Sequence, residues 1–321
     1  MSSAALVALV LTGCQVPLGP VTKVPVDAVR FPETSDPFVV ADGGVYYLYG
    51  SNNDKRAPIT RLADISRPYS LGEKNAASVE GMPTKPAWTA RSMQLWAPTV
   101  MQLAGRWVMW FSADRINPSD PVNAQCIGRA FADSPMGPFV PEPTPVHCGA
   151  DGHGALDPNV FTDADGKHWL LAAFGNTNSP IQSMPLDDFG NIVGPPVTIL
   201  GRTFPWEYWF IENPSMMFDR KNKTYLLSYS AGKWYEGSYS TGIARCTTPT
   251  GPCIGDPSGP WISSSNGRSG PGGLSFFQDN DGAQRAIFST FAAGWETTNG
   301  GRSASVMFVK TDPSVNLTIV K

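Results

Sequence analysis

Hydrophobic residues in this chain gather in pairs of short runs separated by a polar turn. The clearest pair lies in residues 154–175, where a short apolar run (159–162) leads through the turn Asp-Ala-Asp-Gly (163–166) into a longer apolar run (168–174). Short apolar runs bounded by Asp and Gly are typical of β-strands. The pattern therefore predicts a β-hairpin with a Leu-Asp-Pro step at its start.

The same unit occurs five times along the chain. Each copy opens with a proline step, continues with a short apolar strand and a polar turn, and ends in a strand rich in aromatic and aliphatic residues. The five steps are Asp36-Pro37, Ala97-Pro98, Asp157-Pro158, Asn213-Pro214 and Gly270-Pro271, with the prolines 56 to 61 residues apart. A fixed period indicates a repeat architecture, and about 60 residues suits one four-stranded blade with long loops. No helical period of similar length competes. The sequence predicts an all-β fold, a five-bladed β-propeller, over residues 31–321.

The composition agrees with a large β-domain. The chain has 32 Gly and 30 Pro in 321 residues, which indicates many turns rather than disorder because apolar residues still make up 41%. The net charge is −3 and there are no long charge runs. This balance argues against nucleic acid or an anionic lipid surface as the main partner.

Residues 1–14 are predicted as a targeting segment. The apolar run of residues 4–11 ends in Leu-Thr-Gly-Cys14, which resembles the lipobox of bacterial lipoproteins, and it is too short to span a bilayer. No Lys or Arg precedes it, so an ordinary secretory signal or a disordered tail stays open. Residues 15–30, rich in Pro and Val, are predicted as a tether. We expect an exported protein, secreted or held at the cell surface, that contacts the membrane only through a lipid on Cys14.

The remaining four cysteines form two local pairs, Cys126 with Cys148 and Cys246 with Cys253. Neither pair has a histidine at metal-ligand spacing. Two disulfides that close loops are therefore predicted, which also fits export, and four free buried thiols are the alternative.

The residues before the repeated prolines carry the candidate chemistry. In a propeller the first strand of each blade lines the central channel, so equivalent positions meet at one end of the axis. Asp36, Asp157 and Glu212, which directly precedes Asn213, would bring three carboxylates together. Crowded and poorly hydrated carboxylates repel one another, which raises the pKa of at least one. Glycoside hydrolysis needs this arrangement, because one carboxyl must stay protonated while another is ionised.

The motifs together resemble glycoside hydrolase family 43. They are Asp36-Pro37, Trp96-Ala97-Pro98, Leu156-Asp157-Pro158-Asn159-Val160-Phe161 and Ile211-Glu212-Asn213-Pro214. The resemblance covers nearly all of the chain from about Phe31 and implies a five-bladed propeller that hydrolyses arabinofuranosides or xylosides with inversion. It implies Asp36 as the general base, Asp157 as the residue that orients the acid and raises its pKa, and Glu212 as the general acid.

Two further residues are candidates for substrate binding. Arg302, in Gly301-Arg302-Ser303, resembles the glycine-arginine step of the family, whose arginine contacts sugar and acid. Trp96 is expected to face the channel. Glu207, five residues before Glu212, is an alternative general acid.

The fifth blade departs from the family pattern. Many members carry a histidine there, often near a bound calcium, whereas Gly270-Pro271-Gly272-Gly273 has none. We expect no metal ligands and no required cofactor, with calcium left as a possibility, and His153 could supply an imidazole from another blade. Asp163 and Asp279 lie in hairpin turns and are predicted to be structural.

The sequence thus predicts an inverting glycoside hydrolase, a monomer, that acts on arabinofuranosyl linkages of arabinan or arabinoxylan-type polysaccharide. The partner is a pentose-containing polysaccharide or oligosaccharide. A β-xylosidase of the same family is one alternative. A catalytically inactive carbohydrate-binding propeller is the other, because of the missing histidine.

Overall fold

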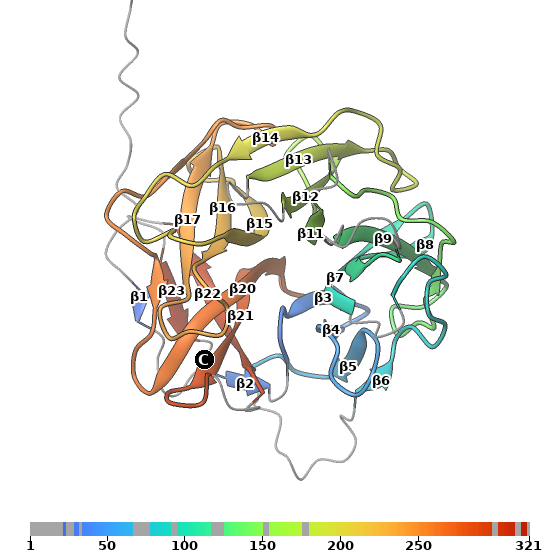
Figure 1. Ribbon diagram of the computed structural model, residues 1–321, viewed down its shortest axis with the longest axis horizontal. Helices are drawn as coiled ribbons and strands as arrows, with labels where there is room; N and C mark the ends of the chain where they lie inside the picture. The colour runs from blue at the N-terminus through green and yellow to red at the C-terminus, as the bar shows by residue number, and fades with distance from the viewer. Residues whose placement is uncertain are drawn as a thin grey trace, which may run out of the picture.

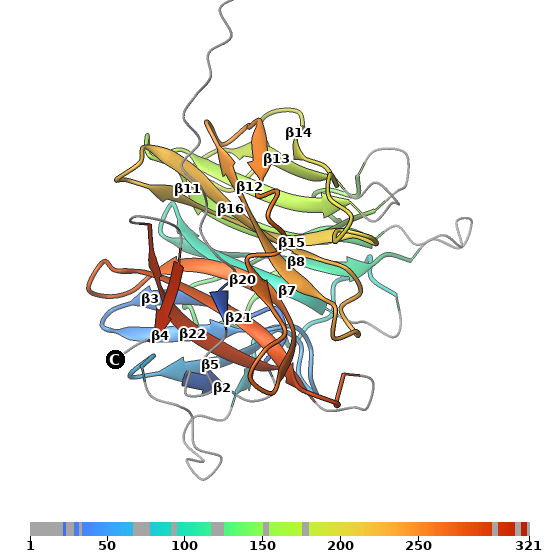
Figure 2. The ribbon, with the colours of Figure 1, turned by 90° about the vertical axis from the view of Figure 1, so that its left-hand side faces the viewer.

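Five small sheets stand around a central axis, with β3, β7, β11, β15 and β20 nearest the centre (Figure 1). The computed structural model describes residues 22–23, 29–31, 34–66, 78–90, 95–116, 125–149, 154–174, 180–296, 301–311 and 316–319. The predicted five-bladed β-propeller is confirmed. In the side view, neighbouring blades of the ring lie against one another (Figure 2). Across the described ranges we find no helix with the length and apolarity that crossing a bilayer requires. The predicted lipobox lies outside them.

The strands follow one another outward from the axis in each blade. Blade 1 contains β3 (Phe38–Asp42), β4 (Val45–Tyr49), β5 (Pro58–Leu62) and β6 (Val79–Glu80). Blade 2 contains β7 (Leu95–Leu103), β8 (Arg106–Asp114), β9 (Gln125–Ala132) and β10 (Val140–Pro141). Blade 3 contains β11 (Ala155–Thr162), β12 (His168–Phe174), β13 (Ile181–Leu186) and β14 (Val197–Leu200).

The last two blades carry additional strands. Blade 4 contains β15 (Ile211–Asp219), β16 (Thr224–Ala231), β17 (Ser240–Cys246), β18 (Cys253–Gly255), β19 (Ile262–Ser263) and β1 (Thr22–Lys23). Blade 5 contains β20 (Arg268–Gln278), β21 (Gln284–Ala292), β22 (Ser303–Lys310), β23 (Asn316–Ile319) and β2 (Val29–Phe31).

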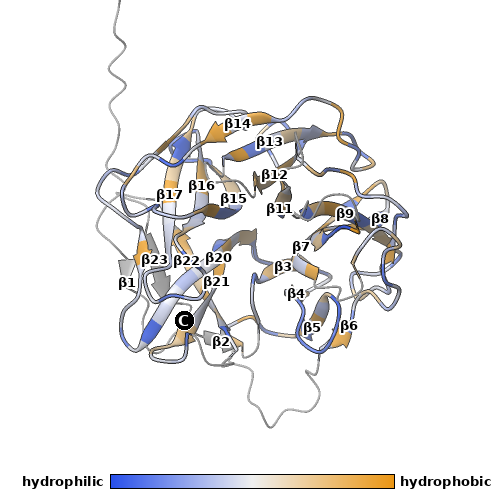
Figure 3. Cartoon of the chain, in the orientation of Figure 1, coloured by the Kyte–Doolittle hydropathy of each residue, from blue (hydrophilic) through white to orange (hydrophobic). Residues whose placement is uncertain are grey.

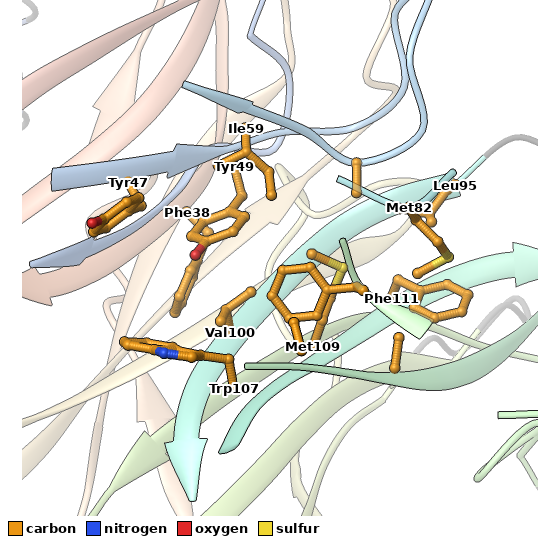
Figure 4. Close-up of a cluster of buried hydrophobic side chains, with 14 of the residues drawn as sticks. Phe38, Tyr47, Tyr49, Ile59, Met82, Leu95, Val100, Trp107, Met109 and Phe111 are labelled. Carbon is orange, nitrogen blue, oxygen red and sulfur yellow. The ribbon is translucent and has the colours of Figure 1, made fainter. Parts of the chain in front are cut away.

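The core is divided into five clusters, one at each contact between neighbouring blades. Strand β8 shows how the sequence produces this: Trp107 and Met109 pack towards blade 1, while Val108 and Trp110 pack towards blade 3. Side chains alternate between the two faces of a strand, and here both faces are covered. The second strands therefore read as continuous apolar runs. Figure 4 shows the cluster between blades 1 and 2, and Figure 3 shows hydrophobic residues distributed around the whole ring.

The N-terminal segment takes part in closing the ring. Strand β2 pairs antiparallel with β22 of blade 5, with Phe31 opposite Ala304, and β1 pairs with β19 of blade 4. Phe31 is buried in the cluster between blades 5 and 1. The segment 15–30 thus differs at these points from a free tether. Strands of two and three residues carry no periodic signal, and their partners lie at the far end of the sequence.

A bulge marks the proline step of the inner strands. In blade 2, Trp96 pairs with Ser112 and Thr99 with Trp110, so Ala97 and Pro98 together face a single residue. The residue before the proline has a left-handed backbone in all five blades, with φ between 46° and 58°. Asp, Asn and Gly adopt this conformation most readily, and Ala97 does so at a cost of roughly 1–2 kcal/mol. The repeated step is therefore a bulge in blades 2 to 5, and in all five blades its first residue has a left-handed backbone.

Two other predictions concern local structure. Oδ1 of Asp163 accepts hydrogen bonds from two backbone N–H groups of its own turn, and Oδ1 of Asp279 does the same, so both are structural as expected. Both disulfides are present, Cys126–Cys148 and Cys246–Cys253.

Candidate active site

Residues at or near the proline steps of all five blades line one small axial cavity. The centre of a water molecule can occupy about 20 Å³ of this cavity. This volume is enough for one water. Its lining includes the residue before the proline in blades 1 to 4, which is Asp36, Ala97, Asp157 or Asn213, and Gly273, two residues after the proline of blade 5. Asp36 lies two residues before the start of β3, Asp157 lies in β11 and Glu212 lies in β15. Two of the three predicted carboxylates thus line the cavity, and the third is the neighbour of Asn213.

Asp36 is held by hydrogen bonds to both carboxylate oxygens. Ser51 Oγ donates to Oδ2 at 2.5 Å, and Asn213 Nδ2 donates to Oδ1 at 3.3 Å. Ser51 also accepts a hydrogen bond from the backbone N–H of Ala97 at 2.9 Å, which ties blade 1 to blade 2. Gly273 packs against the same carboxylate, where an added Cβ would lie 3.0 Å from Oδ1. The base candidate is therefore held in orientation by Ser51 of its own blade and by residues of blades 4 and 5.

Glu212 meets the hydroxyl of a buried tyrosine. Tyr239, directly before β17, places its hydroxyl 2.7 Å from Oε1 of Glu212 and 2.9 Å from Oδ1 of Asn213. The pKa of Glu212 is raised to about 7, chiefly by burial. The hydrogen bond from Tyr239 opposes this rise, the charge of Asp36 adds to it, and the charge of Arg302 opposes it. A carboxyl with this pKa is partly protonated at neutral pH, as a general acid must be.

Asp157 is more deeply buried, and its carboxylate contacts the backbone of β15, the strand that carries Glu212. Its Oδ2 accepts a hydrogen bond from the N–H of Asn213 at 3.1 Å, and its own N–H donates to Ser112 Oγ at 2.7 Å. Burial raises the pKa of Asp157 well above its usual value, and the charges of Glu212 and Asp36 add to this. Asp157 can therefore act on Glu212 in two ways. Its charge affects the pKa of Glu212, and its hydrogen bond to the N–H of Asn213 fixes the peptide group that follows Glu212.

Arg302 is buried beside the site and is fastened by backbone groups. Its guanidinium donates to the carbonyls of Gly270, Ser289 and Trp234 and to Ser289 Oγ. It also lies 5.5 Å from the ring centroid of Tyr239. These hydrogen bonds of Arg302 thus go to groups other than the three carboxylates, and its charge acts on Glu212 through space.

The other sequence candidates fall in different places. Trp96 is part-buried on β7, directly before the bulge at Ala97. Glu207 is buried and accepts hydrogen bonds from the N–H groups of Thr203 and Phe204 and from the hydroxyl of Tyr229. Its carboxylate thus holds together the loop before β15, which makes Glu207 a structural residue. His153 lies outside the described residues.

Sequence reasoning missed Tyr239 and the polar residues that hold Asp36. Serines near the ends of second strands had a visible signal: Ser51, Ser112 and Ser230 each follow an apolar run, and each accepts a hydrogen bond from the inner strand of the next blade. No sequence signal pointed to Tyr239, because the position of its ring depends on the space left by Gly272 in another blade. A Cβ on Gly272 would lie 2.1 Å from Cε1 of Tyr239.

Gly272 and Gly273 of the fifth blade therefore leave room for Tyr239 and Asp36. Calcium takes six to eight oxygen ligands, with carboxylates among them. Within the described ranges, no three His, Cys, Asp or Glu side chains come together as metal ligands would.

A family model of the glycosyl hydrolases family 43 matches residues 28–312. The chain belongs to this family. The family 43 chain is 27% identical over 254 residues to an extracellular endo-α-(1→5)-L-arabinanase of Thermotoga petrophila, covering 72% of this chain and 52% of that protein. It is 28% identical over 149 residues to a xylosidase/arabinosidase 43A of Humicola insolens, covering 43% and 42%. The chain spans about half the length of these relatives.

A solved structure agrees with the fold of this family 43 chain. The crystal structure of a thermostable family-43 glycoside hydrolase superposes with a TM-score of 0.75 at 22% identity, covering 94% of this chain and 97% of the other. At this identity the likeness concerns the fold alone.

Proposed function

We propose that this chain is an inverting glycoside hydrolase that acts on arabinofuranosyl linkages of arabinan or arabinoxylan-type polysaccharide. The observation that carries the proposal is the pairing of Asp36, with both oxygens hydrogen-bonded, with Glu212, whose pKa is raised to about 7 by burial. Arabinosides are favoured because both curated relatives described above carry arabinan or arabinoside activity in their names.

In the proposed mechanism Glu212 donates its proton to the glycosidic oxygen while Asp36 takes a proton from a water on the opposite face of the sugar. The water oxygen bonds to the anomeric carbon as the bond to the leaving group breaks, so the configuration inverts. An inverting pair needs its carboxyl groups roughly 6.5–9.5 Å apart to admit this water. Asn213 and Tyr239 form the hydrogen-bonded link between Asp36 and Glu212, which supports such a separation.

Tyr239 has a part in the proton transfer. Its single phenolic proton can go to Glu212 or to Asn213. When Glu212 is ionised, the hydroxyl donates to it. When Glu212 is protonated, the carboxyl can donate to the phenolic oxygen and Tyr239 can donate to Asn213. The acid thus has a hydrogen-bond partner in both states.

A β-xylosidase activity is the second candidate, because the relative from Humicola insolens is named for both sugars. We further propose that the protein is exported, in line with the relative named as extracellular and with two disulfides. Attachment through a lipid on Cys14, a monomeric state and independence of a cofactor belong to the same proposal.

The test is the release of reducing sugar from linear arabinan, arabinoxylan and xylo-oligosaccharides, with analysis of product sizes. We expect pentose release from arabinan or arabinoxylan that is lost in Asp36→Ala and Glu212→Ala. Release only from xylo-oligosaccharides would select the β-xylosidase. Binding of these sugars without any release would make the protein a carbohydrate-binding propeller.

A further inference from the structure

Exposed aromatic side chains are concentrated at one place on this protein. Among the described residues, six large aromatics are exposed, and five of them lie in loops of blades 4 and 5. We call these five the aromatic rim: Tyr208, Trp209, Trp234, Tyr235 and Trp295, each between 39% and 58% exposed. The sixth, Phe189, lies between β13 and β14 of blade 3. Large exposed apolar surface of this kind marks a binding site more often than chance.

The three loops of the rim lead directly to residues of the active site. The loop 205–210 runs into β15, whose second residue is Glu212. The loop 232–239 follows β16 and ends at Tyr239, the partner of Glu212. Trp295 follows β21, and the connection from there to β22 ends at Arg302. The rim is therefore on the side of the general acid.

The rim is held in place by polar contacts underneath the rings. The hydroxyl of Tyr208 donates to Glu236 at 2.6 Å and lies 2.9 Å from Ser238 Oγ. Lys233 pairs with Glu236 at 2.9 Å and places its ammonium 5.1 Å from the ring centroid of Trp209. These contacts join the loop before β15 to the loop after β16. A surface that is fixed before binding loses less entropy when a ligand binds.

A backbone contact joins the rim to the catalytic centre. Arg302 Nη1 donates to the carbonyl of Trp234 at 3.1 Å, while the same guanidinium lies beside Tyr239. The position of Trp234 is thus set by the residue whose charge acts on Glu212.

We propose that the aromatic rim binds the leaving-group side of a pentosan chain, that is, the sugar units beyond the glycosidic oxygen that Glu212 protonates. This inference rests on the proposed function. The general acid must touch the glycosidic oxygen, so the departing part of the chain extends on its side of the site. Flat aromatic faces offer apolar area to the C–H faces of sugar rings, and the polar edges of Tyr and Trp can bond to hydroxyl groups. A neutral polysaccharide fits this surface better than a charged polymer, because Lys233 is already paired with Glu236.

Binding is measured by isothermal titration in the Glu212→Gln background, so that no bond is cleaved. The probe is a linear α-1,5-arabino-oligosaccharide of six units, compared with the dimer. Trp234→Ala and Trp209→Ala are compared with Phe189→Ala, which removes an exposed aromatic remote from the rim. We expect each tryptophan variant to raise Kd for the six-unit probe about three- to tenfold and to change Kd for the dimer less, with Phe189→Ala unchanged in both.

Equal Kd values in the Trp and Phe variants, an equal effect on both probe lengths, or no binding of the six-unit probe would each overturn the inference. The proposed function is tested separately, by wild-type turnover of an aryl α-L-arabinofuranoside. Turnover with unaffected Kd values would leave the function standing and reject the rim. Binding that depends on the rim, without turnover, would support the rim and reject the proposed hydrolase function.

Discussion

The hydroxyl of Tyr239 lies 2.7 Å from Oε1 of Glu212, and through Asn213 the same hydroxyl is linked to Asp36. The proposed acid and the proposed base therefore share one chain of hydrogen bonds that passes through two neutral side chains. Asp36 comes from blade 1, and the other three residues of this chain, Asn213, Tyr239 and Glu212, come from blade 4. Asp36 and Asn213 lie 177 positions apart in sequence. The pairing of Tyr239 with Glu212 leads to the first prediction.

Tyr239→Phe should move the basic limb of the pH profile of kcat/KM upwards. The hydroxyl favours the ionised form of Glu212 and so lowers its pKa. Without it the pKa rises, and Glu212 keeps its proton to higher pH. We expect a shift of about one pH unit, because a hydrogen bond to a charged group is worth roughly 1.5–3 kcal/mol and one pKa unit about 1.4 kcal/mol.

The matched control for this measurement is Tyr229→Phe. Tyr229 is also buried and donates to a buried glutamate, Glu207, at 2.6 Å. It should lose thermal stability and leave the basic limb where it is. A downward shift in Tyr239→Phe, or the same shift in both variants, would contradict the assignment of Glu212.

Glu212→Gln and Asp36→Asn should differ in their dependence on the leaving group. Loss of a general acid costs roughly 10²–10⁴ in rate when the leaving group needs a proton. With a dinitrophenyl arabinofuranoside, whose leaving group departs unprotonated, Glu212→Gln should recover most of the rate and Asp36→Asn should not. The measurement is kcat/KM for the dinitrophenyl substrate and for an alkyl arabinofuranoside. Equal losses on both substrates would reject Glu212 as the acid.

The raised pKa of Glu212 should also cost stability above neutral pH. Below about pH 4.5 the group is protonated in both the folded and the unfolded protein. Between about 4.5 and 7 the unfolded protein releases the proton first, so stability falls as pH rises. Glu212→Gln removes this loss and should stabilise the protein at pH 8 by on the order of 1–3 kcal/mol, with little effect at pH 4.

Thermal unfolding at the two pH values measures this effect. Glu207→Gln is the comparison, because Glu207 accepts three hydrogen bonds as a structural carboxylate. It should destabilise the protein at pH 8. If Glu212→Gln is less stable than wild type at pH 8, the ionised carboxylate of Glu212 does not destabilise the folded protein, and the prediction fails.

Gly272→Ala should damage activity more than the substitution of an ordinary glycine. Its Cβ would lie 2.1 Å from the ring of Tyr239, so the ring must move away from Glu212. We expect kcat to fall at least tenfold. Gly201→Ala is the control, since nothing lies within 4 Å of its added Cβ, and it should retain wild-type kcat. Equal activity of the two variants would mean that the place of Tyr239 does not matter.

Phe31→Ala should destabilise the ring. Phe31 is 2% exposed and packs between blades 5 and 1, and truncation of a buried Phe costs roughly 3–5 kcal/mol. Urea unfolding should show this loss, while Phe189→Ala, at an exposed site, should change stability by less than about 0.5 kcal/mol. A negligible effect of Phe31→Ala would show that this contact between blades 5 and 1 does not stabilise the ring.

The propeller was predictable because the proline step recurs in the sequence every 56 to 61 residues, once per blade. The first residue of each proline step has a left-handed backbone, so Asp, Asn or Gly recurs at near-equal spacing in four blades, with Ala97 in the remaining one. The same step placed Asp36, Asp157 and the neighbour of Glu212 at one end of the axis. Local chemistry and blade geometry were sufficient for these.

The remaining parts of the site depend on contacts between distant segments. Tyr239 reaches Glu212 because Gly272 of the next blade leaves space, and no pattern near Tyr239 reports this. Strand β2 is three residues long and pairs across nearly the whole chain. The preference between Glu212 and Glu207 rested on a motif, whereas the structure shows a physical difference, because Glu207 is taken up by its own loop.

The most direct test of the central claim is the anomeric configuration of the first product. Proton NMR in the first minutes of hydrolysis of an α-L-arabinofuranoside, before mutarotation, distinguishes the two anomers. If Asp36 activates water on the face opposite to Glu212, the β-anomer must appear first. Initial release of the α-anomer would contradict the proposed roles of Asp36 and Glu212.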